Sequence, residues 1–253
     1  MPTETINTHE AIKLFHQLMQ PNSSVRVLRL NGDGKMGKTH LLTKAFPTLA
    51  QQDYQAPLAI VDLDRRSQTI PDILSQICIQ LDEQNFEGYY AADQAWSNRP
   101  KVDVRGLTAS FSKVDIFAKD NAEGVHDRAR ILTIEFTRDI RKLRAPLVVL
   151  FFDSIDQASE EVQEWLIEML LIPVSRLSHI RVVMAGRFLP EAHGSYRTLC
   201  RDYHLLPVKD VKAYLEYCQN VNPTLSERDI SVLAHAFDYT PGFVAEALRK
   251  FRS

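Results

Sequence analysis

The sequence predicts an α/β fold in which a parallel five-stranded sheet carries helices on both faces, followed by a small helical subdomain. Strand-like and helix-like segments alternate over residues 1–207, which is typical of parallel strands joined by crossover helices. The runs LVVLFF (147–152) and IRVVMA (180–185) are apolar without alternation, as expected of central strands buried on both faces. Only helical patterns follow, so residues 1–207 form the predicted core and residues 208–253 the predicted subdomain.

The individual elements follow from local patterns. Residues 8–19 place apolar side chains at i, i+3, i+4 and i+7, which indicates an amphipathic helix. Pro47 is expected to end the helix that begins at Thr39, and Pro71 suits the first turn of another helix. We predict strands near residues 25–31, 58–63, 147–152, 180–185 and 203–207, and further helices over 70–81, 126–143, 159–171, 209–219, 226–237 and 241–251.

Residues 84–125 interrupt this alternation and are predicted to form an insertion at the edge of the core. The stretch VDVRGLTASFSKVDIF (102–117) alternates like a short β-hairpin that turns around Gly106 or Ser112. The helix over 126–143 then resumes the α/β pattern. We therefore expect the insertion to carry a hairpin.

Composition excludes several classes of protein. The 253 residues are 45% hydrophobic and 25% charged, with a formal net charge of −2, so no general attraction to nucleic acid or to an anionic membrane is expected. The three cysteines lie far apart and form no CxxC motif, which favours a reducing compartment. No signal peptide opens the chain, and no apolar run is long enough to span a membrane. We expect a cytoplasmic protein.

Residues 32–39 read GDGKMGKT and fit the phosphate-binding P-loop pattern, G-x-x-x-x-G-K-[ST]. They hold three of the nine glycines and stand between a predicted strand and a predicted helix. Glycine lets successive backbone N–H groups point at one phosphate, and the helix N-terminus adds its dipole. Lys38 would bring its charge to the β- and γ-phosphates, and the Thr39 hydroxyl would ligate Mg²⁺. The predicted nucleotide-binding residues are Gly32, Asp33, Gly34, Lys35, Met36, Gly37, Lys38 and Thr39.

Acidic residues for the metal side of this site follow the buried strand 147–152. Asp153 stands at the carboxyl edge of the sheet, where doubly wound sheets bind ligands, and would hold Mg²⁺ through its water shell. Asp156 and Glu160 are candidates to orient or deprotonate the attacking water. Both also suit the start of the next helix as capping acids. That alternative is favoured for Glu160 and stays open for Asp156.

Arg187 follows the predicted strand 180–185 at the same edge of the sheet. A cation there would sense the γ-phosphate and stabilise charge in the transition state. A surface arginine is the alternative, and we favour the sensor because the P-loop and the acidic motif precede it in order along the chain.

Taken in order, the segments GDGKMGKT, LVVLFFDSIDQ, IRVVMAGR, LLPVKDVKAYL and YTPGFVAEAL resemble the STAND class of regulatory P-loop ATPases. These are relatives of AAA+ proteins and include the NACHT and NB-ARC types. The resemblance spans most of residues 8–251, and only the P-loop is specific by itself. It implies ATP or ADP with Mg²⁺ as cofactors, a switch role in signalling, transcription or defence, and a protein effector or a second copy as partner. It also suggests Pro241 as an adenine contact, although Thr240 and Pro241 fit a helix start better.

The chain departs from the STAND pattern at two positions. The NACHT-type acidic motif resembles D-G-x-D-E, whereas Gln157 stands here where the second acid often lies. Lys35 stands where the P-loop often has glycine. Both departures predict slow hydrolysis rather than weak binding. The domains that these proteins usually append do not follow, so we expect either a fragment or a core whose effector is another chain.

Three functions stay open at this point. The first is a slow, switch-like ATPase, the second an AAA+ ATPase that acts on DNA as initiator proteins do, and the third a scaffold that binds nucleotide without hydrolysis. The one feature that favours DNA binding is a basic stretch, Arg138, Arg141, Lys142 and Arg144. These positions also fit the solvated face of a helix, so nucleic acid is the less favoured partner. A GTPase is disfavoured because no N-K-x-D motif follows the P-loop, and the scattered histidines predict no zinc site.

Overall fold

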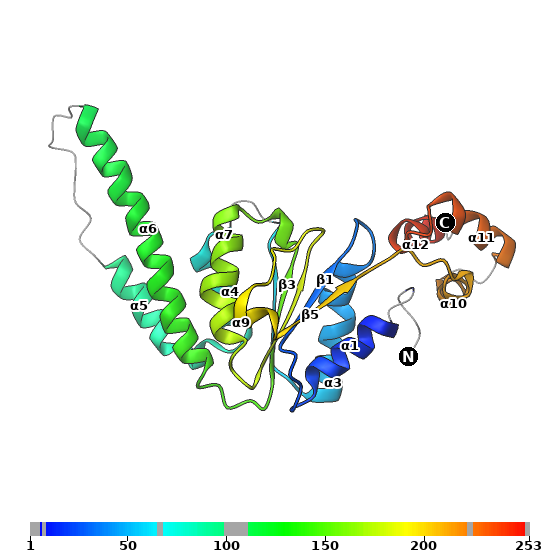
Figure 1. The fold of residues 1–253 in the computed structure, drawn as a ribbon, viewed down its shortest axis with the longest axis horizontal. Helices are drawn as coiled ribbons and strands as arrows, with labels where there is room; N and C mark the ends of the chain where they lie inside the picture. The colour runs from blue at the N-terminus through cyan, green and yellow to red at the C-terminus, as the bar shows by residue number, and fades with distance from the viewer. Residues whose placement is uncertain (1–5, 7–8, 65–67, 99–110, 222–224, 251–253) are drawn as a thin grey trace.

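The computed structural model describes residues 6, 9–64, 68–98, 111–221 and 225–250. Its centre is an all-parallel sheet of five strands in the order β2-β3-β4-β1-β5 (Figure 1). The predicted fold class is therefore confirmed. The strands are β1 (Val27–Asn31), β2 (Leu58–Asp62), β3 (Val148–Asp153), β4 (Ile180–Ala185) and β5 (Cys200–His204).

Four strands lie where the sequence places them, and the fifth is displaced. β4 pairs with both β1 and β3, so it separates the P-loop strand from the strand that ends in Asp153. The sequence predicts the last strand at 203–207, but β5 begins at Cys200, opposite Val27 of β1. β5 is an edge strand with mostly exposed or half-buried residues, so it lacks the apolar run that marks a central strand.

Helices cover both faces of the sheet, and two helical regions extend beyond its ends (Figure 1). α5 and α6 pack against each other at one end of the molecule, and α10, α11 and α12 form the subdomain at the other. The helices are α1 (His9–Met19), α2 (Lys38–His40), α3 (Phe46–Tyr54), α4 (Ile70–Gln80), α5 (Glu87–Ser97), α6 (Phe111–Ile140), α7 (Glu160–Trp165), α8 (Ile172–Val174), α9 (Gly194–Arg197), α10 (Val211–Val221), α11 (Glu227–Ala236) and α12 (Pro241–Lys250). Among the described residues, no helix is both long and apolar enough to cross a membrane.

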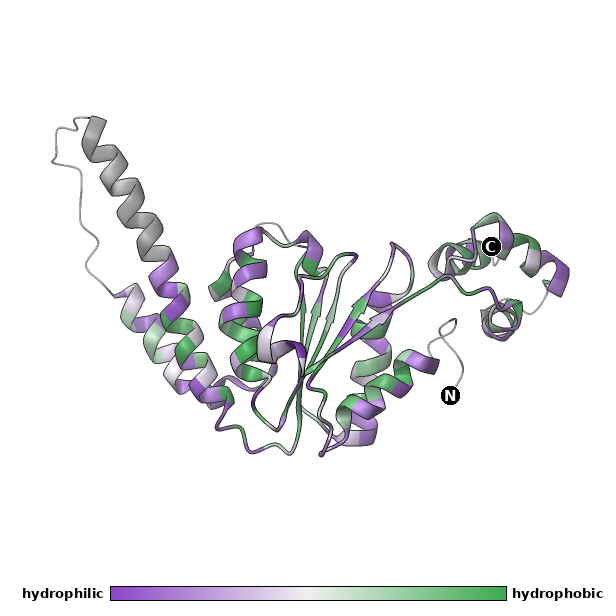
Figure 2. Ribbon diagram, viewed as in Figure 1, coloured by the Kyte–Doolittle hydropathy of each residue, from purple (hydrophilic) through white to green (hydrophobic). Residues whose placement is uncertain are grey.

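Alternate side chains of the strands build two separate hydrophobic cores. Residues 148, 150 and 152 of β3 pack with α4, α6 and α7 on one face, and Val149 and Phe151 pack with α1 and α3 on the other. Figure 2 shows the central strands as largely hydrophobic, in keeping with burial on both faces. Because side chains alternate along a strand, Asp153 follows Phe151 onto the face that carries the helix after the P-loop.

The helix after the P-loop does not end at Pro47, as the sequence predicted, but continues to Tyr54. A π-helical turn, η1 (Leu41–Ala45), joins α2 to α3, and the Phe46 N–H bonds the Leu41 carbonyl five residues back. The same device precedes Pro173, where η4 (Leu166–Leu171) joins α7 to α8. Proline lacks a donor and crowds the preceding turn, and the wider π-turn keeps each helix continuous across it.

The described residues do not form the hairpin predicted within residues 84–125. The first part of this insertion forms a 3₁₀ turn, η2 (Glu83–Asn85), and α5, and α6 already begins at Phe111. The predicted turn at Ser112 thus lies inside a helix, whereas Gly106 lies outside the described residues. A short run of alternating apolar and polar residues fits a helix segment nearly as well as a strand.

Arg181 lies fully buried at the start of β4 and holds the end of α1 against the sheet. Its Nε donates to the Leu18 carbonyl at 2.6 Å, and Nη2 donates to the Gln20 carbonyl at 2.9 Å. Its Nη1 donates to the Ser178 and Ile180 carbonyls at 2.8 and 3.0 Å. Burial, with a smaller contribution from Arg26, lowers the pKa of Arg181 to about 10. The cation suits the negative end of the α1 dipole, so its role is structural.

Candidate functional site

The P-loop connects β1 to α2 at the carboxyl edge of the sheet and takes backbone shapes that favour glycine. Gly32 and Gly37 have φ of 144° and 93°. A Cβ on Gly32 would also lie 2.7 Å from the Leu205 carbonyl oxygen. Lys35 adopts φ of 64°, the left-handed region, although it carries a side chain. The predicted glycine spacing therefore has a structural cause at Gly32 and Gly37, and Lys35 is the exception.

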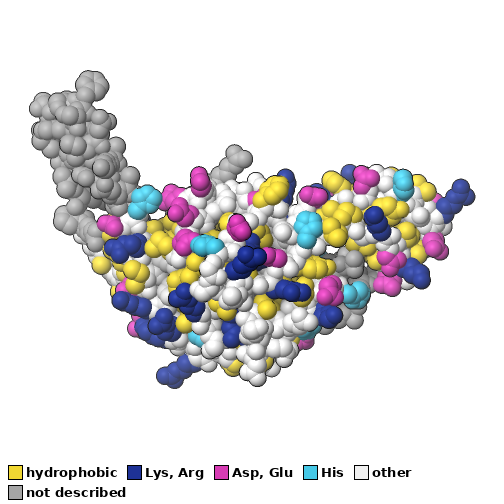
Figure 3. Space-filling model, in the orientation of Figure 1, with side chains coloured by type: hydrophobic (Ala, Val, Ile, Leu, Met, Phe, Trp, Pro, Cys, Tyr) yellow, Lys and Arg dark blue, Asp and Glu magenta, His cyan; other side chains and the backbone are white. Residues whose placement is uncertain are grey.

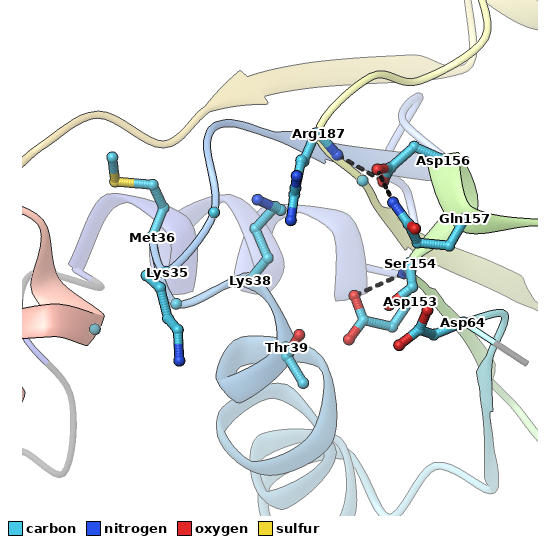
Figure 4. Close-up of a pocket in the computed structure, with 14 residues that line it drawn as sticks. Lys35, Met36, Lys38, Thr39, Asp64, Asp153, Ser154, Asp156, Gln157 and Arg187 are labelled. Carbon is cyan, nitrogen blue, oxygen red and sulfur yellow. Dashed lines mark hydrogen bonds between the residues drawn. The ribbon is translucent and has the colours of Figure 1, made fainter. Parts of the chain in front are cut away.

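A cavity of about 470 Å³ opens above this loop. Figure 4 shows Lys38, Thr39, Asp153 and Arg187 converging on it from the P-loop, β3 and the end of β4. Its walls are formed by Gly34, Lys35, Met36, Gly37, Lys38, Thr39, Asp64, Asp153, Ser154, Asp156, Gln157, Gly186, Arg187 and Gly242. The structure thus brings together the P-loop, the acids after β3 and Arg187, three segments that the sequence predicted to meet.

Lys38 lies within the curve of the loop. Its Nζ donates to the carbonyl oxygens of Gly32 and Asp33, at 2.5 and 2.7 Å. Burial lowers its pKa, and the negative charges of Asp156 and Asp153 oppose that shift. A partly desolvated ammonium held at the mouth of a phosphate-binding loop can pair strongly with an incoming phosphate oxygen.

Thr39 and Asp153 line the same cavity, as a shared Mg²⁺ site requires. The Ser154 N–H donates to Asp153 Oδ1 at 2.9 Å, and Figure 4 shows the Thr39 side chain on the side of the cavity where this carboxylate lies. Asp153 is only 2% exposed, and this burial raises its pKa, whereas the neighbouring Thr39 hydroxyl and the Ser154 N–H lower it. A hydroxyl and a buried carboxylate beside a cavity are the hard oxygen donors that Mg²⁺ takes, together with water and phosphate oxygens. The residues present therefore fit the metal.

Asp156 lies across the cavity from Thr39, beside Arg187 (Figure 4). Its Oδ1 accepts the Arg187 backbone N–H at 2.8 Å, and its Oδ2 accepts the Gln157 side-chain amide at 2.8 Å. A Cβ on Gly186 would lie 2.8 Å from Oδ1, so glycine is required for this approach. Asp156 thus positions the chain that carries Arg187. The Arg187 guanidinium lies close to the P-loop, since a Cβ built on Gly34 would be 3.8 Å from its Nη2.

Glu160 lies where the favoured alternative places it, whereas Asp64 is an addition to the predicted site. Glu160 lies in the first turn of α7, behind the N-cap Ser159, and does not line the cavity, as the favoured alternative holds. Asp64, which the sequence analysis did not single out, lines the cavity beside Asp153. The available signal was an acid directly after the predicted strand 58–63, at the same edge as Asp153.

A second cavity, of about 460 Å³, lies between the P-loop helix and the helical subdomain. Gly37, Thr39 and Thr43 line it from one side, and Tyr217 and Pro241 line it from the other. Pro241 is the first residue of α12, in keeping with the preferred helix start, and it also lies beside this cavity. Its predicted contact with adenine is therefore compatible with its position.

The P-loop is also joined directly to the subdomain. The Gly242 N–H donates to the Lys35 carbonyl at 2.8 Å, and the Lys35 ammonium pairs with the Glu246 carboxylate on α12. A Cβ on Gly242 would lie 2.6 Å from the Lys35 carbonyl oxygen. Lys35, at a position where the P-loop often has glycine, takes the left-handed conformation and presents its carbonyl to α12.

Similar folds are found among solved structures. The chain superposes on Cdc6p of Pyrobaculum aerophilum with a TM-score of 0.58 at 14% identity, covering 96% of this chain and 59% of that one. A Walker-type ATPase of Pyrococcus abyssi gives 0.53 at 13%, covering 94% and 66%. Orc1 of Aeropyrum pernix, solved in complex with DNA, gives 0.50 at 16%, covering 98% and 59%.

The fold is that of a P-loop ATPase. At these identities the likeness is one of fold alone, and it does not support the STAND subclass in particular. The chain spans about three fifths to two thirds of the length of these structures. No protein-family model matches the sequence, and no curated protein does.

Proposed function

We propose that this protein binds ATP with Mg²⁺ and hydrolyses it slowly, as an AAA+-like ATPase. The observation that carries the proposal is that Lys38, Thr39 and the buried carboxylate of Asp153 line one cavity above the P-loop. Together these groups supply a phosphate-facing charge and a pair of metal-side oxygens. When bound, Mg²⁺ would neutralise charge on the β- and γ-phosphates.

Each residue has a distinct part in this proposal. The backbone of the P-loop and Lys38 bind the phosphates, Thr39 and Asp153 hold the metal, and Pro241 borders the space for the base. Arg187 reaches the cavity from the end of β4, where its charge can stabilise the γ-phosphate as the bond to it breaks. Asp156 keeps Arg187 in place through the backbone N–H.

Binding of a fluorescent ATP analogue, with and without Mg²⁺, tests the proposal. We expect Mg²⁺-dependent binding by the unchanged protein and weaker Mg²⁺-dependence in Asp153→Asn. Glu160→Gln is the matched control, since this carboxylate lies nearby on α7 and outside the cavity wall. Absence of binding by the unchanged protein at millimolar nucleotide would refute the proposal.

The subdomain is proposed to respond to which nucleotide is bound. Lys35 belongs to the cavity wall and also contacts Gly242 and Glu246 of α12, so a change in the loop reaches α12 directly. A ligand shifts such an equilibrium only by its different affinity for the two states. We expect hydrogen exchange in α12, or light scattering, to differ between the ATP and ADP complexes. Identical results from both methods would exclude a switch.

Action on DNA, in the manner of an initiator ATPase, is the second candidate. It is supported by the similar folds, among which the Orc1 structure of Aeropyrum pernix contains DNA. Exposed basic residues Arg138, Arg141, Lys142 and Arg144 follow one another at the end of α6 and just beyond it, and Figure 3 shows Lys and Arg side chains gathered on that part of the face. The Lys142 ammonium pairs with Asp139 Oδ1 at 2.8 Å, so it is less available to a DNA phosphate.

A salt titration of duplex DNA binding separates the two candidates. If DNA is a partner, affinity should fall steeply with salt, and Arg141→Ala with Arg144→Ala should reduce the slope. Lys13→Ala, an exposed lysine on α1, serves as the control. Binding that is undetectable at low salt would remove the DNA candidate and leave the ATPase proposal intact.

A further inference from the structure

Few carboxylates in this site are free to activate water, since Gln157 stands where the second acid of the motif often lies. The residue directly after Asp153 is Ser154, which adopts φ of 58° and whose N–H bonds the Asp153 carboxylate. A serine cannot accept the proton of an attacking water as a carboxylate can. Among the described residues, the carboxylates that line the cavity are Asp64, Asp153 and Asp156.

Two of these three carboxylates are already engaged by the protein. Asp153 accepts the Ser154 N–H and lies at the cavity wall with Thr39, on the metal side of the proposed site. Asp156 accepts one hydrogen bond on each oxygen, from the Arg187 backbone and from Gln157. Asp64 accepts none in the part of the chain that the structure describes, and it is exposed to the cavity solvent.

The sheet places Asp64 on the same face as Asp153. Ile60 packs in the core that also contains α1, α3 and Phe151. Because side chains alternate along a strand, Asp62 and Asp64 point to the same face as Ile60. The Leu63 N–H bonds the Asp153 carbonyl at 3.1 Å, so β2 and β3 stay paired up to the residue before Asp64. Asp64 therefore emerges beside Asp153, on the side of the P-loop helix, and Figure 4 shows the two carboxylates next to each other.

We propose that Asp64, and not Asp156, is the carboxylate that orients and deprotonates the attacking water. The proposal rests on the ATPase function proposed above. In the step, the water oxygen forms a bond to the γ-phosphorus as the bond from that phosphorus to the β,γ-bridging oxygen breaks. Asp64 takes the proton from the water, and ADP leaves with the bridging electron pair. Asp64 is thus a catalytic residue, and Asp156 a positioning residue for Arg187.

Single-turnover hydrolysis by excess enzyme tests this assignment with Asp64→Asn, Asp64→Glu and Asp156→Asn, and Glu160→Gln as control. General-base loss costs about 100-fold or more in rate, so Asp64→Asn should fall by that factor while its affinity for Mg²⁺ and ATP stays within about threefold. After incubation it should retain ATP, as chromatography of the bound nucleotide would show. Asp64→Glu should recover part of the rate, with an altered pH profile.

Other outcomes overturn the assignment. Loss of Mg²⁺-dependent binding in Asp64→Asn would make Asp64 a metal-side ligand. An unchanged rate in Asp64→Asn, with a large loss in Asp156→Asn, would make Asp156 the base. An unchanged protein that binds ATP without hydrolysing it also refutes the Asp64 role, and leaves nucleotide binding standing. Failure to bind ATP at all refutes the proposed function instead.

Discussion

Charged groups are buried at both ends of the central strands, and the two ends use them differently. At the start of β4, Arg181 is fully buried and its donors are all taken by backbone carbonyls of the protein. At the end of β3, Asp153 is nearly as buried, but it borders a cavity of about 470 Å³. A buried charge whose partners are all internal holds the fold, whereas one that faces a cavity is available to a ligand.

The largest expected effect on stability comes from removing the buried guanidinium of Arg181. Arg181→Met removes the donors of several buried carbonyls, and unsatisfied buried acceptors cost about 1–3 kcal/mol each, so the unfolding free energy should fall by about 3–5 kcal/mol. Urea denaturation measures it, with the exposed Arg201→Met as control. A loss below about 1 kcal/mol would mean that water replaces the guanidinium and that the site is not closed.

At the cavity above the P-loop, a substitution should reduce nucleotide affinity and leave stability nearly unchanged. Lys38→Met removes the phosphate-facing charge, and nucleotide affinity should fall about 10- to 100-fold, because a charge-assisted hydrogen bond contributes about 1.5–3 kcal/mol. Its unfolding free energy should change little, since burial already disfavours the charged lysine and lowers its pKa. Fluorescence titration and urea denaturation measure both, with Lys13→Met as control. Equal loss of stability and affinity would contradict the contrast with Arg181.

Asp153→Asn should stabilise the protein without Mg²⁺. Burial raises the pKa of Asp153, so the folded state binds its proton more tightly than the unfolded state does. The stability that protonated Asp153 contributes is present below the pKa that this group has in the unfolded chain. It is lost as the pH rises through the higher pKa that the group has in the folded protein. The variant should therefore melt above the unchanged protein at pH 7, and the difference should shrink as pH falls toward 4. A lower melting temperature at pH 7 would contradict the raised pKa.

The smallest effect is expected at the contact between loop and subdomain. Lys35 and Glu246 form an ion pair whose side chains are 48% and 49% exposed, and such pairs contribute about 0–1 kcal/mol. A double-mutant cycle with Lys35→Ala and Glu246→Ala should give a coupling within that range that weakens with salt. Gly242→Ala should perturb the contact more, because its Cβ would overlap the Lys35 carbonyl. A coupling above about 2 kcal/mol would show that the pair is desolvated in solution.

Local patterns sufficed for most of the fold and for the phosphate side of the site. Gly37, Lys38 and Thr39 carry their spacing in the sequence, and Asp153 is marked by the apolar run before it. The pairing of β2 with β3, which makes Asp64 a neighbour of Asp153, depends on sheet order and has no local signal. The contact of Lys35 with Glu246 joins residues 211 positions apart, and no sequence period reports it.

Ile6 has a consequence for the order in which the chain folds. It is 7% exposed and packs in the core of the helical subdomain, with Val208, Tyr214 and Val244. During synthesis, Ile6 must therefore wait for α10, α11 and α12 before it finds its partners, while the sheet can already close at β5. Contacts of such long sequence separation form slowly. The helical subdomain should thus assemble after the sheet, and until then Ile6 and its partners would expose their apolar side chains.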